Sequence, residues 1–416
     1  MNGTPDVHTT NPLDLNVLIV GSGICGLTAA IACKEKGFNV TVLEALEQFT
    51  HVGAGLSIAA NSTRVLLGMG LRESLDKAGG IIKRVRFHNN TGDTVLAERL
   101  FEDSEIKLGY PAWMIHRGDL HDVLLQKARD VKVDIKMGAL VIDFDGQAPS
   151  VTLQDGTVLN ADVILSYRSR ARSCLKGRRD EPRFSGNSCF RALIPCSELD
   201  DPELAPLIDW AYPSNYCWVG DGQFVVAYPV RQGKSYNIVL TQPAIHTKGD
   251  KFVVNANQDE VVELYKHWDP RLVKILKKLP QENVLEWKLC DLDPLDSWIL
   301  PGGKIVLLGD AAHAVLPSSS MGAAMGIEDG AAIAELLARA KDKSQIPAVI
   351  KAFQDLRLPR CTDVMLSGRH NVARWKTMEA DSESTQATHG VSVNDSFWDY
   401  DIKREAKKIA IEAIEV

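Results

Sequence analysis

The sequence lacks the features that direct a protein to nucleic acid or into a bilayer. Its 47 lysines and arginines are outnumbered by 54 aspartates and glutamates, which gives a net charge of −7. A surface of this sign disfavours contact with a phosphate backbone, so we expect no nucleic-acid partner. No apolar run reaches the roughly 20 residues that a membrane-spanning helix requires, so we expect no membrane span.

Paired cysteines and a secretion signal are also missing. The eight cysteines are scattered singly, and none forms a Cys-x-x-Cys pair. This pattern favours free thiols in a reducing cytosol over a disulfide framework. The N-terminus is polar and lacks the apolar stretch of a signal peptide. We therefore expect a cytoplasmic protein without a metal site, in which residues 1–14 form a disordered lead.

What the chain does contain is ordinary for a globular protein. Apolar residues make up 45% and charged residues 24% of its 416 residues. This length predicts two or three domains with a large core.

The first 45 residues have the pattern of a strand, a helix and a second strand. Residues 16–20 (NVLIV) and 39–43 (NVTVL) are short apolar runs of the kind found in buried parallel strands. Residues 24–36 between them are rich in small residues and end at Gly37, so they predict a helix. Together they form a βαβ unit of about 30 residues.

Further along, the pattern changes twice. Helices are expected over 62–78, 117–130, 258–279 and 322–340, and a buried strand over 304–308. The middle of the chain alternates apolar and polar residues over 189–194, 223–230 and 236–242, as half-buried antiparallel strands do. The sequence therefore predicts an α/β unit interrupted by a mostly β insert.

A glycine-rich turn follows the first strand. Gly21, Gly23 and Gly26 form a G-x-G-x-x-G fingerprint that opens the helix, in which the glycines permit a tight turn and close approach of a pyrophosphate. Glu44 ends the second strand 23 residues after Gly21, near the spacing of the acid that binds a ribose hydroxyl. Its charge disfavours a 2′-phosphate, which leaves FAD or NAD. The expected contacts here also include Ile24, Cys25 and Ala45.

The segment LLGDAAH at 307–313, followed by Pro317 and a Gly/Ala-rich helix, resembles flavoproteins of the para-hydroxybenzoate and salicylate hydroxylase type. MIHRGDLHDVL, CFRALIP, DPLDSW and FWDYD also resemble this family. The resemblance implies that Asp310 binds a ribityl hydroxyl of FAD and that Arg117 lies against the cofactor. It also implies that the helix beginning near Gly322 and Ala323 points its positive end at the flavin.

The resemblance implies a Rossmann-like FAD-binding domain interleaved with a mostly antiparallel substrate-binding domain, plus C-terminal helices. The FAD-binding domain is expected over residues 15–80, 108–183 and 285–365, the substrate-binding domain over 81–107 and 184–284, and the helical tail over 366–416.

One family motif is altered. Relatives carry an Asp-Gly pair after the strand expected at 162–165, which serves FAD and the transient NAD(P)H site, whereas this chain has Arg168 and Ser169. Either the arginines at 168, 170 and 172 hold pyrophosphates more strongly, or the nicotinamide site is impaired, or the loop merely varies.

The resemblance implies an FAD-dependent monooxygenase reduced by NADPH or NADH. Such an enzyme inserts one atom of O2 into a cyclic, aromatic or natural-product-like small molecule through a flavin C4a-hydroperoxide. A redox-silent cyclisation or isomerisation is the alternative, motivated by the altered motif. Arg191, a cation in an apolar strand, is either a ligand of a substrate phenolate or carboxylate or paired with an acid. Tyr228, Tyr236 and Pro317 are further catalytic candidates. We expect a monomer or homodimer.

Overall fold

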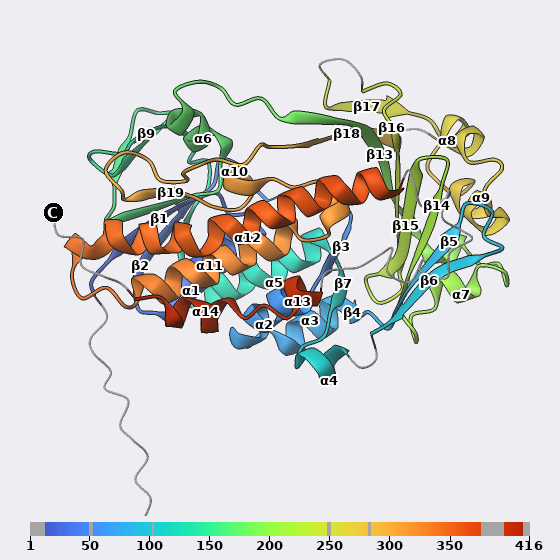
Figure 1. The fold of residues 1–416 in the computed structure, drawn as a ribbon, viewed down its shortest axis with the longest axis horizontal. Coiled ribbons are helices and arrows are strands. Elements are labelled where there is room, and N and C mark those ends of the chain that lie inside the picture. Colours follow the sequence, from blue (N-terminus) through green and yellow to red (C-terminus); the bar gives the residue numbers. More distant parts are fainter. Residues whose placement is uncertain are drawn as a thin grey trace, which may run out of the picture.

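The computed structural model describes residues 13–49, 53–101, 104–247, 251–281, 284–375 and 395–410. Most of the lead expected at residues 1–14 lies outside them. Figure 1 shows two units side by side, a layered α/β unit on the left and a strand-rich unit on the right. Along the described ranges we find no helix with the length and apolar character needed to cross a bilayer.

Five parallel strands form the centre of the α/β unit. Their order is β19-β12-β1-β2-β8, and their apolar side chains belong to one large core. Burial on both faces explains why β1, β2, β12 and β19 read as mostly apolar runs. The expected strands at 16–20 and 39–43 are confirmed. The bounds are β1 (Asn16–Val20), β2 (Asn39–Leu43), β8 (Asp134–Lys136), β12 (Val163–Ser166) and β19 (Ile305–Leu307).

Helices pack against this sheet and against one another. A Cβ on Gly330 would lie 2.7 Å from the backbone nitrogen of Ala29, so the missing side chain lets two of these helices, α1 and α11, meet closely. Figure 1 shows α12 running across the molecule beside α11. The bounds are α1 (Ile24–Glu35), α5 (Arg117–Asp130), α11 (Gly322–Leu337) and α12 (Ile346–Trp375).

An eight-stranded sheet forms the second unit. Its order is β17-β18-β13-β16-β15-β14-β5-β6, and it is antiparallel except where β14 pairs with β5. The expected alternation is confirmed. The bounds are β5 (Arg84–Asn89), β6 (Val95–Leu100), β13 (Arg183–Pro195), β14 (Ser214–Gly220), β15 (Gln223–Val230), β16 (Ser235–Pro243), β17 (Val253–Ala256) and β18 (Val284–Asp291).

The two faces of this sheet have different neighbours. Phe190, Ala227 and Tyr236 share one face and join a core with the helices α7 (Ala205–Ile208), α8 (Gln258–Leu264) and α9 (Pro270–Leu276). Arg191 and Tyr228 are one residue away from members of that core on their own strands, so they face the opposite side, toward the α/β unit.

Two expected helices are each divided in the structure. The stretch 62–78 forms α2 (Ala60–Gly68) and α3 (Arg72–Ala78), separated near Gly70, whose φ of +75° is left-handed. The stretch 258–279 forms α8 and α9. Asp269 accepts a hydrogen bond from the N–H of Arg271, and Pro270 occupies the first turn. Because proline has no N–H to give to a preceding turn, a new helix begins there.

Shorter elements complete the fold. The hairpin expected around Asp155-Gly156 is confirmed. The bounds are β3 (Gly55–Ile58), β4 (Gly79–Ile81), β7 (Trp113–His116), β9 (Val141–Asp145), β10 (Ser150–Leu153), β11 (Val158–Asn160), α4 (Ser104–Leu108), α6 (Ser169–Lys176), α10 (Asp310–His313), α13 (Asp395–Trp398) and α14 (Ile402–Lys408).

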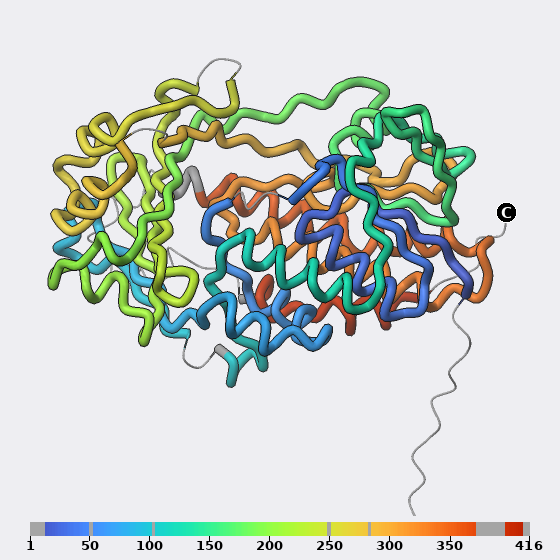
Figure 2. The backbone as a smooth tube through the Cα atoms, turned by 180° about the vertical axis from the view of Figure 1, so that it is seen from behind, coloured from blue at the N-terminus to red at the C-terminus, as the bar shows by residue number. Residues whose placement is uncertain are grey.

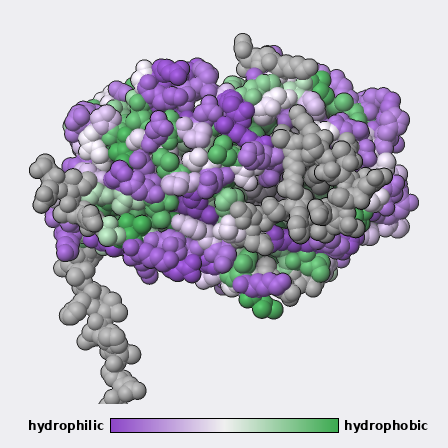
Figure 3. Space-filling view, in the orientation of Figure 1, coloured by the Kyte–Doolittle hydropathy of each residue, from purple (hydrophilic) through white to green (hydrophobic). Residues whose placement is uncertain are grey.

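The chain passes between the units more than once. Figure 2 shows two long crossings, green after α6 and orange after β18. The boundary expected at residue 366 falls inside α12, which continues to Trp375, while α14 packs on α11. Residues 376–394 of the expected tail lie outside the described residues. On the face drawn in Figure 3, hydrophilic residues are interrupted by separate hydrophobic patches.

Candidate functional site

The glycine-rich turn connects β1 to α1 at the carboxyl edge of the parallel sheet. Gly21 has a φ of +107°, which favours glycine, and a Cβ on Gly26 would lie 2.0 Å from the carbonyl oxygen of Gly21. A Cβ on Gly23 would meet nothing within 4 Å, so this part of the turn is open to an approaching group. The α1 N-terminus has no side-chain cap, so its N–H groups are available to an anion.

Glu44 lies at the end of the neighbouring strand, β2. Its Oε2 accepts hydrogen bonds from the N–H and the hydroxyl of Ser22, at 3.0 and 2.6 Å. Its Oε1 accepts from the N–H of Leu46 and from Arg168. Burial would raise the pKa of Glu44, but these hydrogen bonds and the charge of Arg168 lower it. The carboxylate therefore stays ionised at the edge of the turn.

Asp310 follows β19 on the other side of the same edge. Gly309 before it has a φ of +56° and a ψ of −142°, a conformation that favours glycine. The carboxylate of Asp310 is exposed, and no hydrogen bond to it is found within the described parts of the chain. It is therefore available to a ligand hydroxyl.

A buried group of charged residues holds the turn at Gly309 and Asp310 in place. Asp329 accepts from the N–H of Gly309 at 2.9 Å, from His313 at 2.6 Å and from Arg357 at 2.8 Å. Burial would raise the pKa of Asp329, but the charges of His313 and Arg357, together with these hydrogen bonds, lower it to about 2. Cys361 also lies close enough to share a metal ion with His313 and Asp329. However, the guanidinium of Arg357 contacts Cys361 at 3.5 Å and supplies a positive charge there already.

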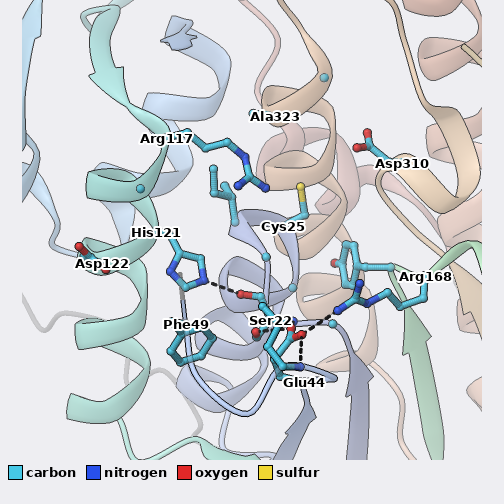
Figure 4. Close-up of a pocket in the computed structure, with 18 of the residues that line it drawn as sticks. Ser22, Cys25, Glu44, Phe49, Arg117, His121, Asp122, Arg168, Asp310 and Ala323 are labelled. Atoms are coloured by element: carbon cyan, nitrogen blue, oxygen red, sulfur yellow. Dashed lines mark hydrogen bonds and ion pairs between the residues drawn. The ribbon is translucent and has the colours of Figure 1, made fainter. Parts of the chain in front are cut away.

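Arg117 begins α5 and extends toward the turn, as Figure 4 shows. His121, one helical turn further on, contacts the carbonyl oxygen of Ser22 at 2.8 Å through Nε2. Phe49 packs against the His121 ring with centroids 5.0 Å apart. These three side chains line the α5 side of the site.

The glycine-rich turn, Glu44, Asp310 and the α5 side chains surround one cavity of about 640 Å³, whereas the buried charges around Asp329 lie outside its lining. Most of the site residues expected from the sequence line it: Gly21, Gly23, Ile24, Cys25, Gly26, Glu44, Arg117, Arg191, Asp310, Gly322 and Ala323. The structure also adds residues that had not been singled out: Ser22, Leu46, Phe49, Gly118, His121, Asp122, Tyr167 and Val315. The spacing of Arg117 and His121 on one helix face was a signal for His121, whereas the loop position of Phe49 gave none.

Four expected residues are not part of the cavity lining, namely Ala45, Tyr228, Tyr236 and Pro317. Tyr228 is buried on the cavity-facing side of the sheet, where burial raises its pKa. Tyr236 is in the core on the opposite face, because successive strand residues point to opposite sides. Pro317 is exposed in a short 3-10 turn beyond α10.

The altered segment after β12 places its three arginines differently. Only Arg168 lines the cavity. Arg170 donates to the carbonyl oxygen of Ile142 outside it. Arg172 is buried, pairs with Asp180, and donates to carbonyl oxygens next to Asp310, including that of Ala312 at 3.0 Å. The hypothesis that three arginines hold the pyrophosphate is therefore wrong for two of them.

The residues around the cavity suit FAD in their hydrogen-bonding groups. The N-termini of two long helices, α1 at Ile24 and α11 at Gly322, lie at the cavity. Neither N-terminus has a side-chain cap in the described structure. The N-terminus of α1 suits the pyrophosphate, and the N-terminus of α11 suits the electron-accepting edge of the flavin. Glu44 and Asp310 would bind the ribose and ribityl hydroxyls.

Comparison with known proteins agrees with this fit. The model of the "FAD binding domain" family matches residues 14–162 and 300–367. The FAD-dependent monooxygenase OpS4 of Beauveria bassiana is 33% identical over 356 residues, covering 83% of this chain and 82% of the relative. The chain belongs to the FAD-dependent monooxygenase family. The chain is also 30% identical to 3-hydroxybenzoate 6-hydroxylase 1 of Aquipseudomonas alcaligenes, over 85% of this chain and 88% of the relative.

Solved structures show the same fold for this monooxygenase. A salicylate hydroxylase substrate complex matches 96% of this chain and 99% of its own, with a TM-score of 0.80 and 24% identity. CtdE in complex with FAD and substrate 4 matches 95% and 97%, with a TM-score of 0.84 and 24% identity. The expected fold class and the FAD cofactor are confirmed. The family match leaves out residues 163–299, where the altered segment and most of the strand-rich unit lie.

Proposed function

We propose that the enzyme uses NADPH or NADH and O2 to hydroxylate a cyclic, aromatic small molecule that carries a phenolate or carboxylate. Arg191 carries the substrate part of this proposal. It lines the cavity from β13, on the sheet face turned toward the α/β unit. Its one hydrogen bond joins Nε to the sulfur of Cys189 at 3.3 Å, and no acid pairs with it within the described residues. A half-buried cation without a carboxylate partner favours an anionic ligand.

Tyr228 lies on the same face of the sheet as Arg191. The strand register pairs Arg191 with Val239 and Val239 with Val226, two residues from Tyr228. The positive charge of Arg191 opposes the rise in the pKa of the buried Tyr228 hydroxyl, so the two groups interact. We assign Arg191 to binding the anionic group of the substrate and Tyr228 to donating a hydrogen bond near it.

Bound FAD would supply the redox and oxygen-transfer chemistry, and the chain supplies position and shelter. Asp310 and Glu44 would hold the two sugar portions of the cofactor. The N-terminus of α11 at Gly322 and Ala323 would stabilise negative charge on the reduced ring. The eight-stranded sheet, from which Arg191 lines the cavity, would cover the substrate side and shield it from water.

The redox-silent alternative has one observation in its favour, the replacement of the Asp-Gly pair by Arg168 and Ser169. The names of the relatives do not favour it. We further propose that the enzyme works in the cytoplasm as a monomer or homodimer, which size-exclusion chromatography with light scattering would test.

The experiment is a panel of phenols, hydroxybenzoates and uncharged ring analogues, assayed with NADPH and NADH. We expect anionic compounds to stimulate nicotinamide oxidation and to gain one oxygen atom from 18O2, seen by mass spectrometry. Arg191→Met should raise KM for them about 10- to 100-fold, the effect of removing a charged hydrogen bond. Arg231→Met is the control, since Arg231 pairs with Asp119 away from the cavity. If no compound stimulates nicotinamide oxidation, the redox-silent reaction is favoured instead.

A further inference from the structure

Arg168 lines the FAD cavity beside the glycine-rich turn. Only Tyr167 separates it from the end of β12, and α6 begins immediately after it. Because β1 lies between β12 and β2 in the sheet, the side chain must pass over the end of β1 to reach Glu44 on β2. Its Nη2 donates to Oε1 of Glu44 at 2.8 Å, as the dashed line in Figure 4 shows. The Nε lies 3.4 Å from the point that a Cβ of Gly21 would occupy.

The two members of this ion pair are exposed to very different degrees. The side chain of Glu44 is 5% exposed, whereas that of Arg168 is 48% exposed. The carboxylate is fixed by Ser22 and Leu46 and cannot turn away from an arriving anion. The guanidinium has five N–H donors, and this pairing uses one of them. It therefore retains donors for a second anion at the glycine-rich turn.

The negative charges at this position favour a nearby cation. The FAD pyrophosphate brings negative charge to the turn beside Ser22, whose N–H and hydroxyl Glu44 already engages. Two anions at short range disfavour each other, more so where water is scarce. The positive N-terminal end of α1 offsets part of this repulsion. Arg168 is the basic side chain that contacts the Glu44 carboxylate.

We infer that Arg168 is a cofactor-affinity residue that serves Glu44 and the FAD pyrophosphate together. It compensates the buried carboxylate before FAD binds and interacts with the phosphates when FAD is bound. It acts on the ADP half of the cofactor and leaves the flavin ring unaffected. This role depends on FAD binding and not on the proposed substrate or reductant.

The test measures binding to the full-length chain stripped of flavin. FAD is followed by quenching of its fluorescence, and ADP and riboflavin are followed by calorimetry. We expect Arg168→Met to weaken FAD and ADP about 10-fold, as loss of one charge-assisted contact does, and to leave riboflavin unchanged. The FAD Kd should also depend less on salt, because one screened attraction is gone. Arg168→Lys should recover part of the affinity.

Arg170→Met is the matched control. It removes the same charge two residues away, from a side chain that donates to Ile142 outside the cavity. Its FAD Kd should equal that of the wild type. In a Glu44→Gln background, Arg168→Met should still weaken FAD, because the phosphates are its second partner.

Several results would overturn the inference. Equal FAD Kd values for Arg168→Met and Arg170→Met would show that the Arg168–Glu44 pair is only a surface ion pair. A loss of the Arg168 effect in the Glu44→Gln background would show that Arg168 acts only through Glu44. Weakening of riboflavin as strongly as ADP, with a lower Tm of the flavin-free chain, would indicate a folding defect. If the methionine variant does not fold, Arg168→Lys, which retains the charge, serves as the test of whether Arg168 contributes to FAD affinity.

Discussion

Asp329 on α11 accepts a hydrogen bond from the backbone N–H of Gly309 at 2.9 Å, across the boundary between a helix and a strand end. The same carboxylate pairs with the buried Arg357 at 2.8 Å. The turn that presents Asp310 to the cofactor cavity is therefore held in place by the fully buried carboxylate of Asp329. This makes the flavin-binding turn sensitive to substitutions that touch no ligand.

Asp329→Asn should destabilise the protein strongly. The change leaves His313 buried beside a neutral group and Arg357 with Glu328 as its remaining buried carboxylate, and breaking a buried ion pair costs about 3–5 kcal/mol. We expect the free energy of unfolding in urea to fall by this amount and FAD binding to weaken with it. Asp355→Asn on α12, an exposed residue paired with Lys351, should change neither quantity by more than about 0.5 kcal/mol.

Asp329 should also confer a defined acid sensitivity. Its pKa is lowered to about 2 in the folded protein, so its contribution to stability is present above the usual aspartate range and is lost as pH falls toward 2. The difference in unfolding free energy between wild type and Asp329→Asn should therefore shrink by about 2 kcal/mol between pH 5 and pH 2. Urea titrations at several pH values measure this, and a constant difference would contradict it.

His313 should act in the opposite direction. Burial would lower the pKa of His313, but the neighbouring Cys361 and the pairing with Asp329 raise it well above its usual value. Its contribution is full below the ordinary histidine pKa and declines only as pH rises toward the raised value. We expect the destabilisation by His313→Gln to be larger at pH 6 than at pH 9. Thermal melts of both proteins at these two pH values give the comparison.

Two glycines of the same turn should respond differently to alanine. Gly26→Ala places a Cβ 2.0 Å from the carbonyl oxygen of Gly21, so we expect misfolding or insoluble protein. Gly23 has a φ of −66°, which alanine adopts, and free space around it. Gly23→Ala should fold with an unchanged Tm and bind FAD about 10-fold more weakly, because the methyl group enters the cavity. Unchanged FAD affinity would show that the cofactor stays away from this residue.

The segment after residue 394 is tied to the core through Arg360. This side chain donates to the carbonyl oxygen of Phe397 at 2.7 Å, lies 3.9 Å from the centre of the Tyr400 ring, and pairs with the buried Glu328. Arg360→Met should lower the unfolding free energy by about 1–3 kcal/mol. It should also speed proteolysis near residue 400. Arg404→Met removes an exposed side chain that, among the described residues, pairs only with its neighbour Glu405, so it should have neither effect.

The sequence predicted the cofactor edge well because its signals are local. The glycines, Glu44 and Asp310 each stand at the end of an apolar strand, and parallel strands bring these ends together. Tyr236 was predicted to serve catalysis, but its position in a strand relative to Arg191 depends on pairing through β16, which no local pattern states. The pair of Arg168 and Glu44 joins residues 124 apart in sequence, so only the strand order reveals it.

The order of strands also bears on how the protein is made on the ribosome. The edge strand β19 of the parallel sheet begins at Ile305, after the whole strand-rich unit has been synthesised. Asp310 and α11 come later still, so an emerging chain cannot complete the flavin site until most of it has left the ribosome. We therefore expect early folding to proceed through the strand-rich unit and local pieces such as the first βαβ segment, with closure of the long-range contacts as the late step.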